Sequence, residues 1–289
     1  MKIGLALLIV TFISVGALAQ NAPTLRIVTE TPGLPSELYY GDVKVKPLRL
    51  RPGTNQPITI NDVDFFVQQQ YIDFLVRMPD TNGFATWVQT LQACPNGGYG
   101  EFENPHCDRV HVSAGFYRSE EFLGRGYWAY RFYEVAFDRR PTYAEFIPDM
   151  VKVGGSQSPS SELASKNAYK DDFVQRSEFT TRYNALSNAA FVNAIEANAE
   201  VDLDNTALTG QLNGGKTRAQ LLREIVESQP VEDKFFNRGF VSMQYFGYLR
   251  RNPDPIGYQG WVEALDADPQ NFRHMIFGFI YSTEYLTRF

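Results

Sequence analysis

The chain has few of the side chains that most often carry metal or nucleophilic chemistry. Among its 289 residues are three histidines and two cysteines. Isolated histidines such as His106, His111 and His274 more often face solvent or pack than catalyse. The sequence also lacks an H-E-x-x-H motif, a P-loop, a dinucleotide-binding glycine motif, an EF-hand loop and a G-x-S-x-G elbow. We therefore predict no catalytic residue, no metal ligand and no cofactor.

A block of basic residues is missing as well, and the formal net charge is −6. An acidic surface repels the phosphates of nucleic acids, so we expect no nucleic-acid partner. Aromatic residues are plentiful at 14% of the chain. This composition favours well-filled interfaces between helices over disorder.

A long apolar run occurs at the N-terminus. It extends from Ile3 to about Val15 after one basic residue and is followed by Ala17-Leu18-Ala19. This layout is typical of a signal peptide, and the run is shorter than the roughly 20 residues that a membrane-spanning helix needs. We therefore expect residues 1–19 to be cleaved between Ala19 and Gln20. The mature chain would be exported (periplasmic, cell-surface or secreted), soluble and without a membrane span.

The two cysteines, Cys94 and Cys107, lie in one short segment, CPNGGYGEFENPHC. In an oxidising compartment, a pair this close is most simply a disulfide. A metal site that combines both thiolates with His106 or His111 is the weaker alternative, because two sulfur ligands without a second C-x-x-C form a poor zinc motif.

One segment of the chain occurs twice. Residues 66–91 (FVQQQYIDFLVRMPDTNGFATWVQTL) and 240–265 (FVSMQYFGYLRRNPDPIGYQGWVEAL) are identical at twelve of twenty-six positions. The apolar spacing predicts a helix, a turn containing proline, and a second helix capped by aspartate. We interpret the shared residues as structural: Phe66, Tyr71, Arg77, Pro79, Asp80, Gly83 and Trp87, which correspond to Phe240, Tyr245, Arg251, Pro253, Asp254, Gly257 and Trp261.

Weaker copies lie between these two segments. Tyr133, Arg139 and Pro141 follow Tyr71, Arg77 and Pro79 at an offset of 62 residues, whereas Glu145 and Asp149 replace Gly83 and Trp87. A closing element, S-E-E-F at 119–122 and S-T-E-Y at 282–285, also recurs. We infer four units, about 62–124, 125–183, 188–232 and 235–289. Their apolar stripes must be buried by neighbouring units.

The predicted fold is therefore mostly α, an array of four degenerate helix-hairpin repeats. Residues 20–60 are rich in Pro and Gly, and we expect an extended arm that can contain short β-strands. Residues 61–153 would form a first helical lobe containing repeats 1 and 2. A Gly/Ser linker would follow at 154–167, and a second helical lobe at 168–289 would hold the rest of repeat 2 and repeats 3 and 4.

Two family resemblances rest on these motifs. The pattern F-V-x-x-x-Y-x-x-x-L-x-R-x-P-D-x-x-G, with a Trp four residues after the Gly, and the S-x-E-aromatic element resemble the bacterial domain of unknown function 4214 over about residues 62–289. That resemblance implies an exported, all-helical module and assigns no catalytic residue. Arg139-Arg140-Pro141 with Glu145-Phe146, and Ser282 to Tyr285, are distantly similar to phycobilisome linker domains. This similarity implies only an assembly role.

We expect a non-catalytic binding or assembly module of the bacterial cell envelope or extracellular space, with a protein or glycan partner at the cell surface. The alternative is an extracellular enzyme that acts on glycans through paired carboxylates. Capping explains Asp80 and Asp254 better than calcium does, and core packing explains the tryptophans better than sugar stacking. The candidate acids are Glu120, Glu121, Glu134, Glu145 and Asp149.

Overall fold

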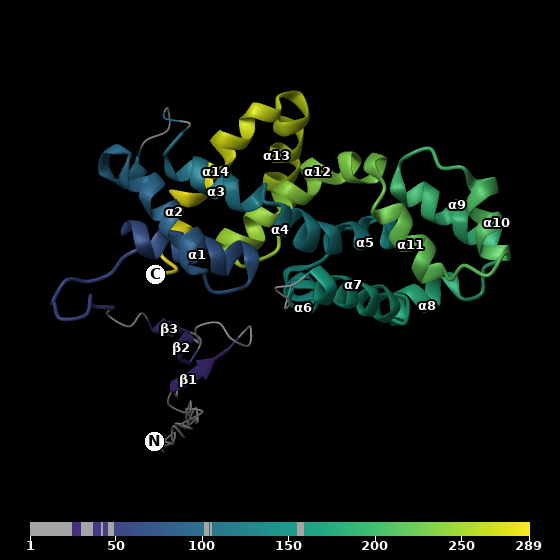
Figure 1. The fold of residues 1–289 in the computed structure, drawn as a ribbon, viewed down its shortest axis with the longest axis horizontal. Coiled ribbons are helices and arrows are strands. Elements are labelled where there is room, and N and C mark those ends of the chain that lie inside the picture. Colours follow the sequence, from purple (N-terminus) through teal and green to yellow (C-terminus); the bar gives the residue numbers. More distant parts are fainter. Residues whose placement is uncertain are drawn as a thin grey trace, which may run out of the picture.

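A computed structural model describes residues 25–29, 37–41, 43–45, 49–100, 104, 106–154 and 159–289. This part of the chain is mostly helical, with a small antiparallel sheet near the N-terminus, as predicted (Figure 1). None of its helices is both long and apolar enough to cross a membrane. The expected signal peptide, residues 1–19, and its cleavage site at Ala19 and Gln20 lie outside the described residues.

The N-terminal arm contains short strands, in agreement with the sequence. They are β1 (Leu25–Val28), β2 (Glu37–Tyr40) and β3 (Val43–Val45), paired in that order. An ion pair ties the sheet to the helical body, because Glu37 Oε1 lies 2.7 Å from both Lys44 Nζ and Arg250 Nη1.

Four helical units follow the arm. Unit 1 holds α1 (Val63–Leu75), α2 (Thr81–Gln92), α3 (Arg109–Tyr117) and α4 (Glu120–Phe122). A π-helical turn, η2 (Leu123–Tyr127), leads to unit 2, with α5 (Trp128–Phe137), α6 (Tyr143–Gly154), α7 (Pro159–Phe173) and α8 (Ser177–Tyr183). Unit 3 holds α9 (Asn188–Ala199), α10 (Asn205–Asn213) and α11 (Arg218–Val226). Unit 4 holds α12 (Gln229–Gln244), the π-helical turn η3 (Tyr245–Leu249), α13 (Pro255–Ala267), α14 (Phe272–Ile280) and α15 (Thr283–Leu286).

The backbone repeats more regularly than the sequence does. In every unit the first helix ends at a non-glycine residue in the left-handed region, with φ between 51° and 54°. These residues are Val76, Asp138, Glu200 and Arg250. The next helix is capped four residues later, and in unit 3 the cap is Asp204, whose carboxylate accepts a hydrogen bond from the Ala207 amide. Unit 3 thus keeps the turn although it lacks the Pro-Asp-x-x-Gly pattern.

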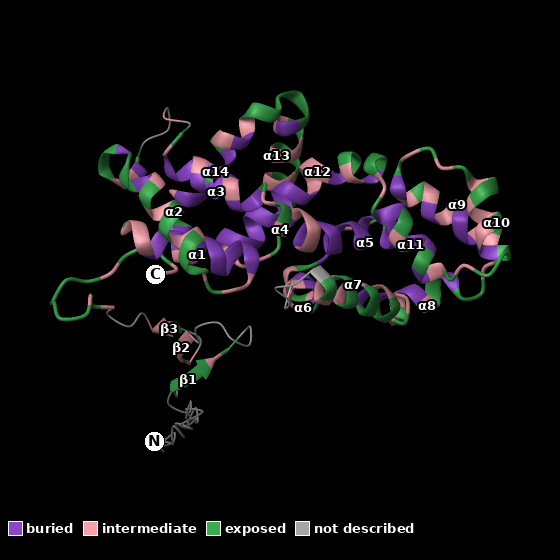
Figure 2. Cartoon of the chain, in the orientation of Figure 1, coloured by how far each residue is buried: buried purple, intermediate pink, exposed green. Residues whose placement is uncertain are grey.

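Units 1 and 4 pack against each other even though they are farthest apart in sequence. Helix α14 packs on α3 (Figure 1), and η3 packs on α1. The buried carboxylate of Asp73 on α1 is bound by Arg288, with Nη2 to Oδ1 at 2.9 Å and Nη1 to Oδ2 at 3.2 Å. Unit 4 also contacts unit 2, because α12 packs against α5. Unit 3 contacts the same helix through α9 and α11. Buried residues are accordingly concentrated in central helices such as α5 (Figure 2).

The prediction of a linker at 154–167 is wrong for residues 159–167, because these residues belong to α7. Most of this helix is polar, and its first two turns therefore resemble a linker in composition. Tyr169 and Phe173 near its end are buried against Phe132 of α5, with ring centroids 5.2 Å away in both cases. The contact of α14 with α3 also crosses the boundary expected between the two lobes, because burying the stripe of unit 1 requires unit 4.

Candidate functional site

The tryptophans of units 1 and 4 serve packing. Trp87 is half-buried, and its indole covers Gly115 with its centroid 5.5 Å from that of Phe116. In unit 4, Trp261 also packs over the third helix but lies farther from Gly278, with an indole carbon 3.9 Å from the position of a Cβ on that glycine. The absence of a side chain at Gly115 leaves room for the indole of Trp87, because a Cβ there would lie 2.4 Å from an indole carbon.

The aspartates of the repeated turn are helix caps. Asp80 and Asp254 each accept a hydrogen bond of 2.8 Å at Oδ1 from the amide of Gly83 or Gly257. These backbone hydrogen bonds lower the pKa of both carboxyls. Among the described residues, no group of three or more His, Cys, Asp or Glu side chains could hold a metal ion.

The repeated arginine clamps the turn of each motif to its closing element. Arg77 binds Glu121 through Nε and Nη2, both at 2.8 Å. Arg251 binds Glu284 in the same way at 2.6 and 3.0 Å. In unit 2, Arg139 binds Glu178 at 3.3 and 2.6 Å. Both halves of this clamp are visible in the sequence motifs, but their pairing is not.

The cysteines form the predicted disulfide, with 5.5 Å between the Cα atoms of Cys94 and Cys107. The loop that it closes also contacts unit 4. The Gly100 amide donates a hydrogen bond of 2.7 Å to the Tyr281 hydroxyl, and the rings of Tyr99 and Tyr281 meet edge to face.

Unit 2 lacks the packing of tryptophan on glycine that units 1 and 4 share, and it contains a groove. Asp149 stands at the position of Trp87, and Asp172 and Arg176 stand at those of Gly115 and Ser119. A cavity of about 470 Å³ occupies the corresponding region. We call it the unit 2 groove. It is lined by Tyr133, Phe137, Arg139, Ala144, Glu145, Pro148, Asp149, Lys152, Asp172, Arg176, Ser177 and Glu178.

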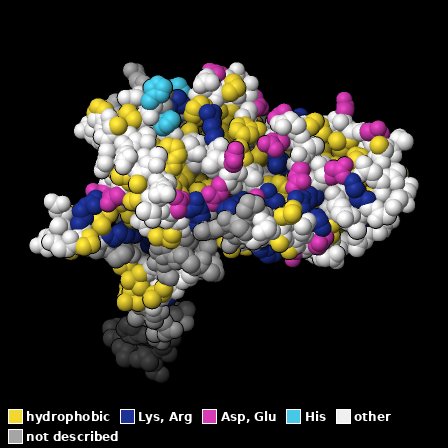
Figure 3. All heavy atoms as spheres, in the orientation of Figure 1, with side chains coloured by type: hydrophobic (Ala, Val, Ile, Leu, Met, Phe, Trp, Pro, Cys, Tyr) yellow, Lys and Arg dark blue, Asp and Glu magenta, His cyan; other side chains and the backbone are white. Residues whose placement is uncertain are grey.

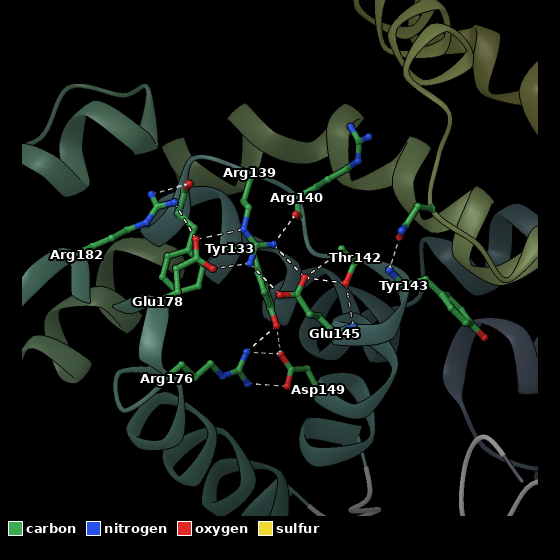
Figure 4. Close-up of polar contacts among 12 residues, drawn as sticks. Tyr133, Arg139, Arg140, Thr142, Tyr143, Glu145, Asp149, Arg176, Glu178 and Arg182 are labelled. Atoms are coloured by element: carbon green, nitrogen blue, oxygen red, sulfur yellow. Dashed lines mark hydrogen bonds and ion pairs between the residues drawn. The ribbon is translucent and has the colours of Figure 1, made fainter. Parts of the chain in front are cut away.

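Asp149 forms the floor of the groove and is buried (Figure 4). Its carboxylate accepts hydrogen bonds from the hydroxyls of Tyr133 (2.7 Å) and Tyr169 (3.0 Å). The guanidinium of Arg176 binds both of its oxygens, at 2.7 and 2.9 Å. Burial, and then the charge of Asp149, raise the pKa of both tyrosines, so their hydroxyls remain protonated donors.

Glu145 and Glu178 form one wall of the groove on either side of Arg139 (Figure 4). Arg139 binds both Glu145 oxygens, at 2.9 and 3.0 Å, in addition to its clamp with Glu178. The amide and hydroxyl of Thr142 also donate to Glu145. Partial burial raises the pKa of Glu145, but the hydrogen bonds from Arg139 and Thr142 outweigh that effect and lower the pKa to about 2.

The C-terminal part of the chain is similar to a known protein family. Residues 231–289 match the family model described as Domain of unknown function (DUF4214). This match confirms the predicted resemblance over unit 4 and covers most of α12 and the elements after it. No curated protein and no solved structure matches the chain.

The structure brings two of the five candidate acids together, Glu145 and Asp149, in a unit beside the DUF4214 segment. Glu121 is in the clamp with Arg77, and Glu120 is exposed. Glu134 is buried on α5 and accepts a hydrogen bond from Tyr130. Asp172 and Arg176 were not predicted as site residues. Aligning the closing elements at an offset of 57 residues, which places them on Gly115 and Ser119, could have found them.

Proposed function

We propose that this chain is an exported, non-catalytic binding module of the cell envelope or extracellular space, and that the unit 2 groove is its binding site. One observation carries the proposal. Units 1 and 4 fill the corresponding region with an indole on a glycine, whereas unit 2 lines it with Asp149, Asp172 and Arg176. A unit that needed only stability would bury apolar surface there, because buried charges stabilise less than hydrophobic packing.

The charged residues of the repeated turns in units 1 and 4 have structural explanations. The clamps Arg77–Glu121 and Arg251–Glu284 hold turns, and Asp80 and Asp254 cap helices. On the face shown in Figure 3, acidic and basic side chains are interspersed over the helical body. Such a surface favours a partner recognised by a defined site over one attracted by a strong field of one sign. Export is proposed from the N-terminal segment, residues 1–19.

Capture of an envelope component tests this function. We would immobilise the mature chain and compare it with a variant that restores the packing of units 1 and 4, Asp149→Trp with Asp172→Gly and Arg176→Ser. We expect a component of an envelope extract to be retained by the wild type and lost with the variant. Equal retention by both proteins, or no retained component, would contradict the proposal.

Hydrolysis of a glycan is the second candidate, because Glu145 and Asp149 share the groove. The lowered pKa of Glu145 argues against it, since a carboxyl that is ionised at neutral pH is a poor general acid. Release of reducing ends from polysaccharides by the wild type, abolished in Glu145→Gln, would show an enzyme. We expect no turnover from either protein.

A further inference from the structure

We propose that the ligand of the unit 2 groove is an uncharged sugar ring within a polysaccharide. This inference rests on the proposed function and specifies its ligand class. The size of the groove supports a ligand of this class. A volume of about 470 Å³ is in the range of small-molecule sites. The groove also lies where units 1 and 4 hold an indole, and a hexose ring is of comparable size.

The composition of the walls suits a ring that is apolar on its faces and polar at its edges. Ala144 and Pro148 supply exposed apolar surface, and the rings of Tyr133 and Phe137 lie buried against the guanidinium of Arg139. Around them, carboxylates and cations are fixed by mutual ion pairs, so the polar groups are held in place before a ligand arrives.

The charge balance argues against an anionic ligand. Three cations line the groove, Arg139, Lys152 and Arg176, against the four carboxylates of Glu145, Asp149, Asp172 and Glu178. All five N–H donors of Arg139 already have acceptors, on Glu145, Glu178 and the Arg140 carbonyl. A phosphate or carboxylate on the ligand would have to displace these bonds and would face the excess of carboxylates.

The remaining hydrogen-bonding capacity matches hydroxyl groups. Each carboxylate offers about four acceptor sites, and a lysine ammonium offers three donors. At the rim, Lys152 and Asp172 form an ion pair of 3.0 Å and are each half exposed, and the same Asp172 oxygen lies 3.4 Å from Arg176 Nη2. Hydroxyls donate to such carboxylates and accept from such an ammonium, and a sugar ring presents several of them on adjacent carbons. A peptide backbone offers one N–H donor per residue and fits less closely.

Calorimetric titration tests the ligand class. The neutral probes are hexamers of glucose and of N-acetylglucosamine, and the comparison probes are polygalacturonate and an unstructured neutral decapeptide. We expect a neutral hexamer to bind, and we expect Asp149→Trp/Asp172→Gly/Arg176→Ser to weaken that binding at least about tenfold. Lys152→Ala should weaken it several-fold, because it removes a donor at the rim. Lys216→Ala is the matched control, since Lys216 pairs with Glu224 outside the groove, and it should bind like the wild type.

Each outcome separates this inference from the proposed function. If neither hexamer binds while an envelope component is still retained through the groove, the sugar inference is wrong and the binding function stands. Tighter binding of the decapeptide or of polygalacturonate has the same meaning. Hexamer binding that is unchanged in the triple variant would place the sugar site elsewhere and overturn the inference. If the triple variant does not fold, as judged by circular dichroism, Lys152→Ala against Lys216→Ala decides.

Discussion

The hydroxyl oxygen of Tyr245 occupies the space that a Cβ atom on Gly257 would need, and Tyr71 stands in the same relation to Gly83. The two tyrosines are buried, at 4% and 3% exposure, so neither ring can easily move away. The carboxylate of the capping aspartate lies at 3.0 to 3.1 Å from the same positions. The glycine of each turn is therefore required by a close approach between two helices, although its backbone is helical.

Two glycines of α13 should respond oppositely to alanine. Gly257→Ala should destabilise the protein by about 1–3 kcal/mol, because the new methyl group overpacks a filled site. Gly260 has no atom within 4 Å of its Cβ position, so Gly260→Ala should stabilise the helix by about 0.5–1 kcal/mol. Urea denaturation of both variants measures the difference. Equal effects of the two substitutions would refute the steric argument.

The arginine clamp should contribute more in unit 1 than in unit 4. Arg77 and Glu121 are 23% and 24% exposed, against 40% and 47% for Arg251 and Glu284. Solvent screens the more exposed pair, so we expect about 1–2 kcal/mol for the unit 1 pair and no more than about 1 kcal/mol for the unit 4 pair. Double-mutant cycles with Arg→Met and Glu→Gln measure both couplings. A stronger coupling in unit 4 would contradict this ranking.

Glu134 should make stability fall as the pH rises. Burial raises its pKa above the ordinary 4.5. The protonated form is therefore favoured in the folded state, and the associated stability is full below pH 4.5 and is lost as the pH passes through the raised pKa. Glu134→Gln should remove this loss, so its stability relative to the wild type should increase from pH 4 to pH 8. Urea denaturation across that range measures the trend, and a constant difference would argue against a buried neutral carboxyl.

Glu145 should show the opposite sign. Its folded pKa of about 2 lies below the ordinary 4.5. The stability from its ion pair is thus present above pH 4.5 and is lost as the pH falls toward 2. Glu145→Gln should be less stable than the wild type at pH 6, and the two proteins should converge near pH 2. Thermal unfolding in the same buffers provides the measurement, and a gap that widens in acid would exclude the assigned ion pair.

The disulfide should stabilise both its own loop and the contact with unit 4. Closing a loop of this length contributes about 3 kcal/mol in the chain-entropy account. Replacing Cys94 and Cys107 by alanine should lower stability by about that amount and should expose Tyr281. Hydrogen exchange at Gly100 reports on that contact. Unchanged protection in the variant would show that the loop is positioned without the disulfide.

The sequence predicts local structure well where a residue interacts with its near neighbours in the sequence. Helix α1 ends at Leu75, shortly before Pro79, and Asp80 caps α2 by accepting a hydrogen bond from the Gly83 amide, so the Pro-Asp pattern identifies the turn. The disulfide was predictable for the same reason, since the two cysteines are close in sequence. Apolar spacing likewise located the helices of units 1 and 4.

Features that depend on distant segments were not predictable from one sequence. Nothing in Arg288 indicates that it binds Asp73, because the pairing exists only once units 1 and 4 meet. The polar composition at the start of α7 predicts a linker, because Tyr169 and Phe173, which anchor this helix, come later in it. In the unit 2 groove, Glu145 and Asp149 are recognisable in the sequence as departures from the repeat. The partner of Asp149, Arg176, lies in the turn between α7 and α8, so the sequence does not indicate this ion pair.

The ion pair between Asp73 and Arg288 has a consequence for biosynthesis. While the ribosome is still making the chain, the carboxylate on α1 must wait for a partner that is 215 residues away. The interior of unit 1 therefore stays incomplete until unit 4 has emerged. Linear repeat arrays can fold progressively from one end, whereas unit 1 of this molecule has to close on unit 4.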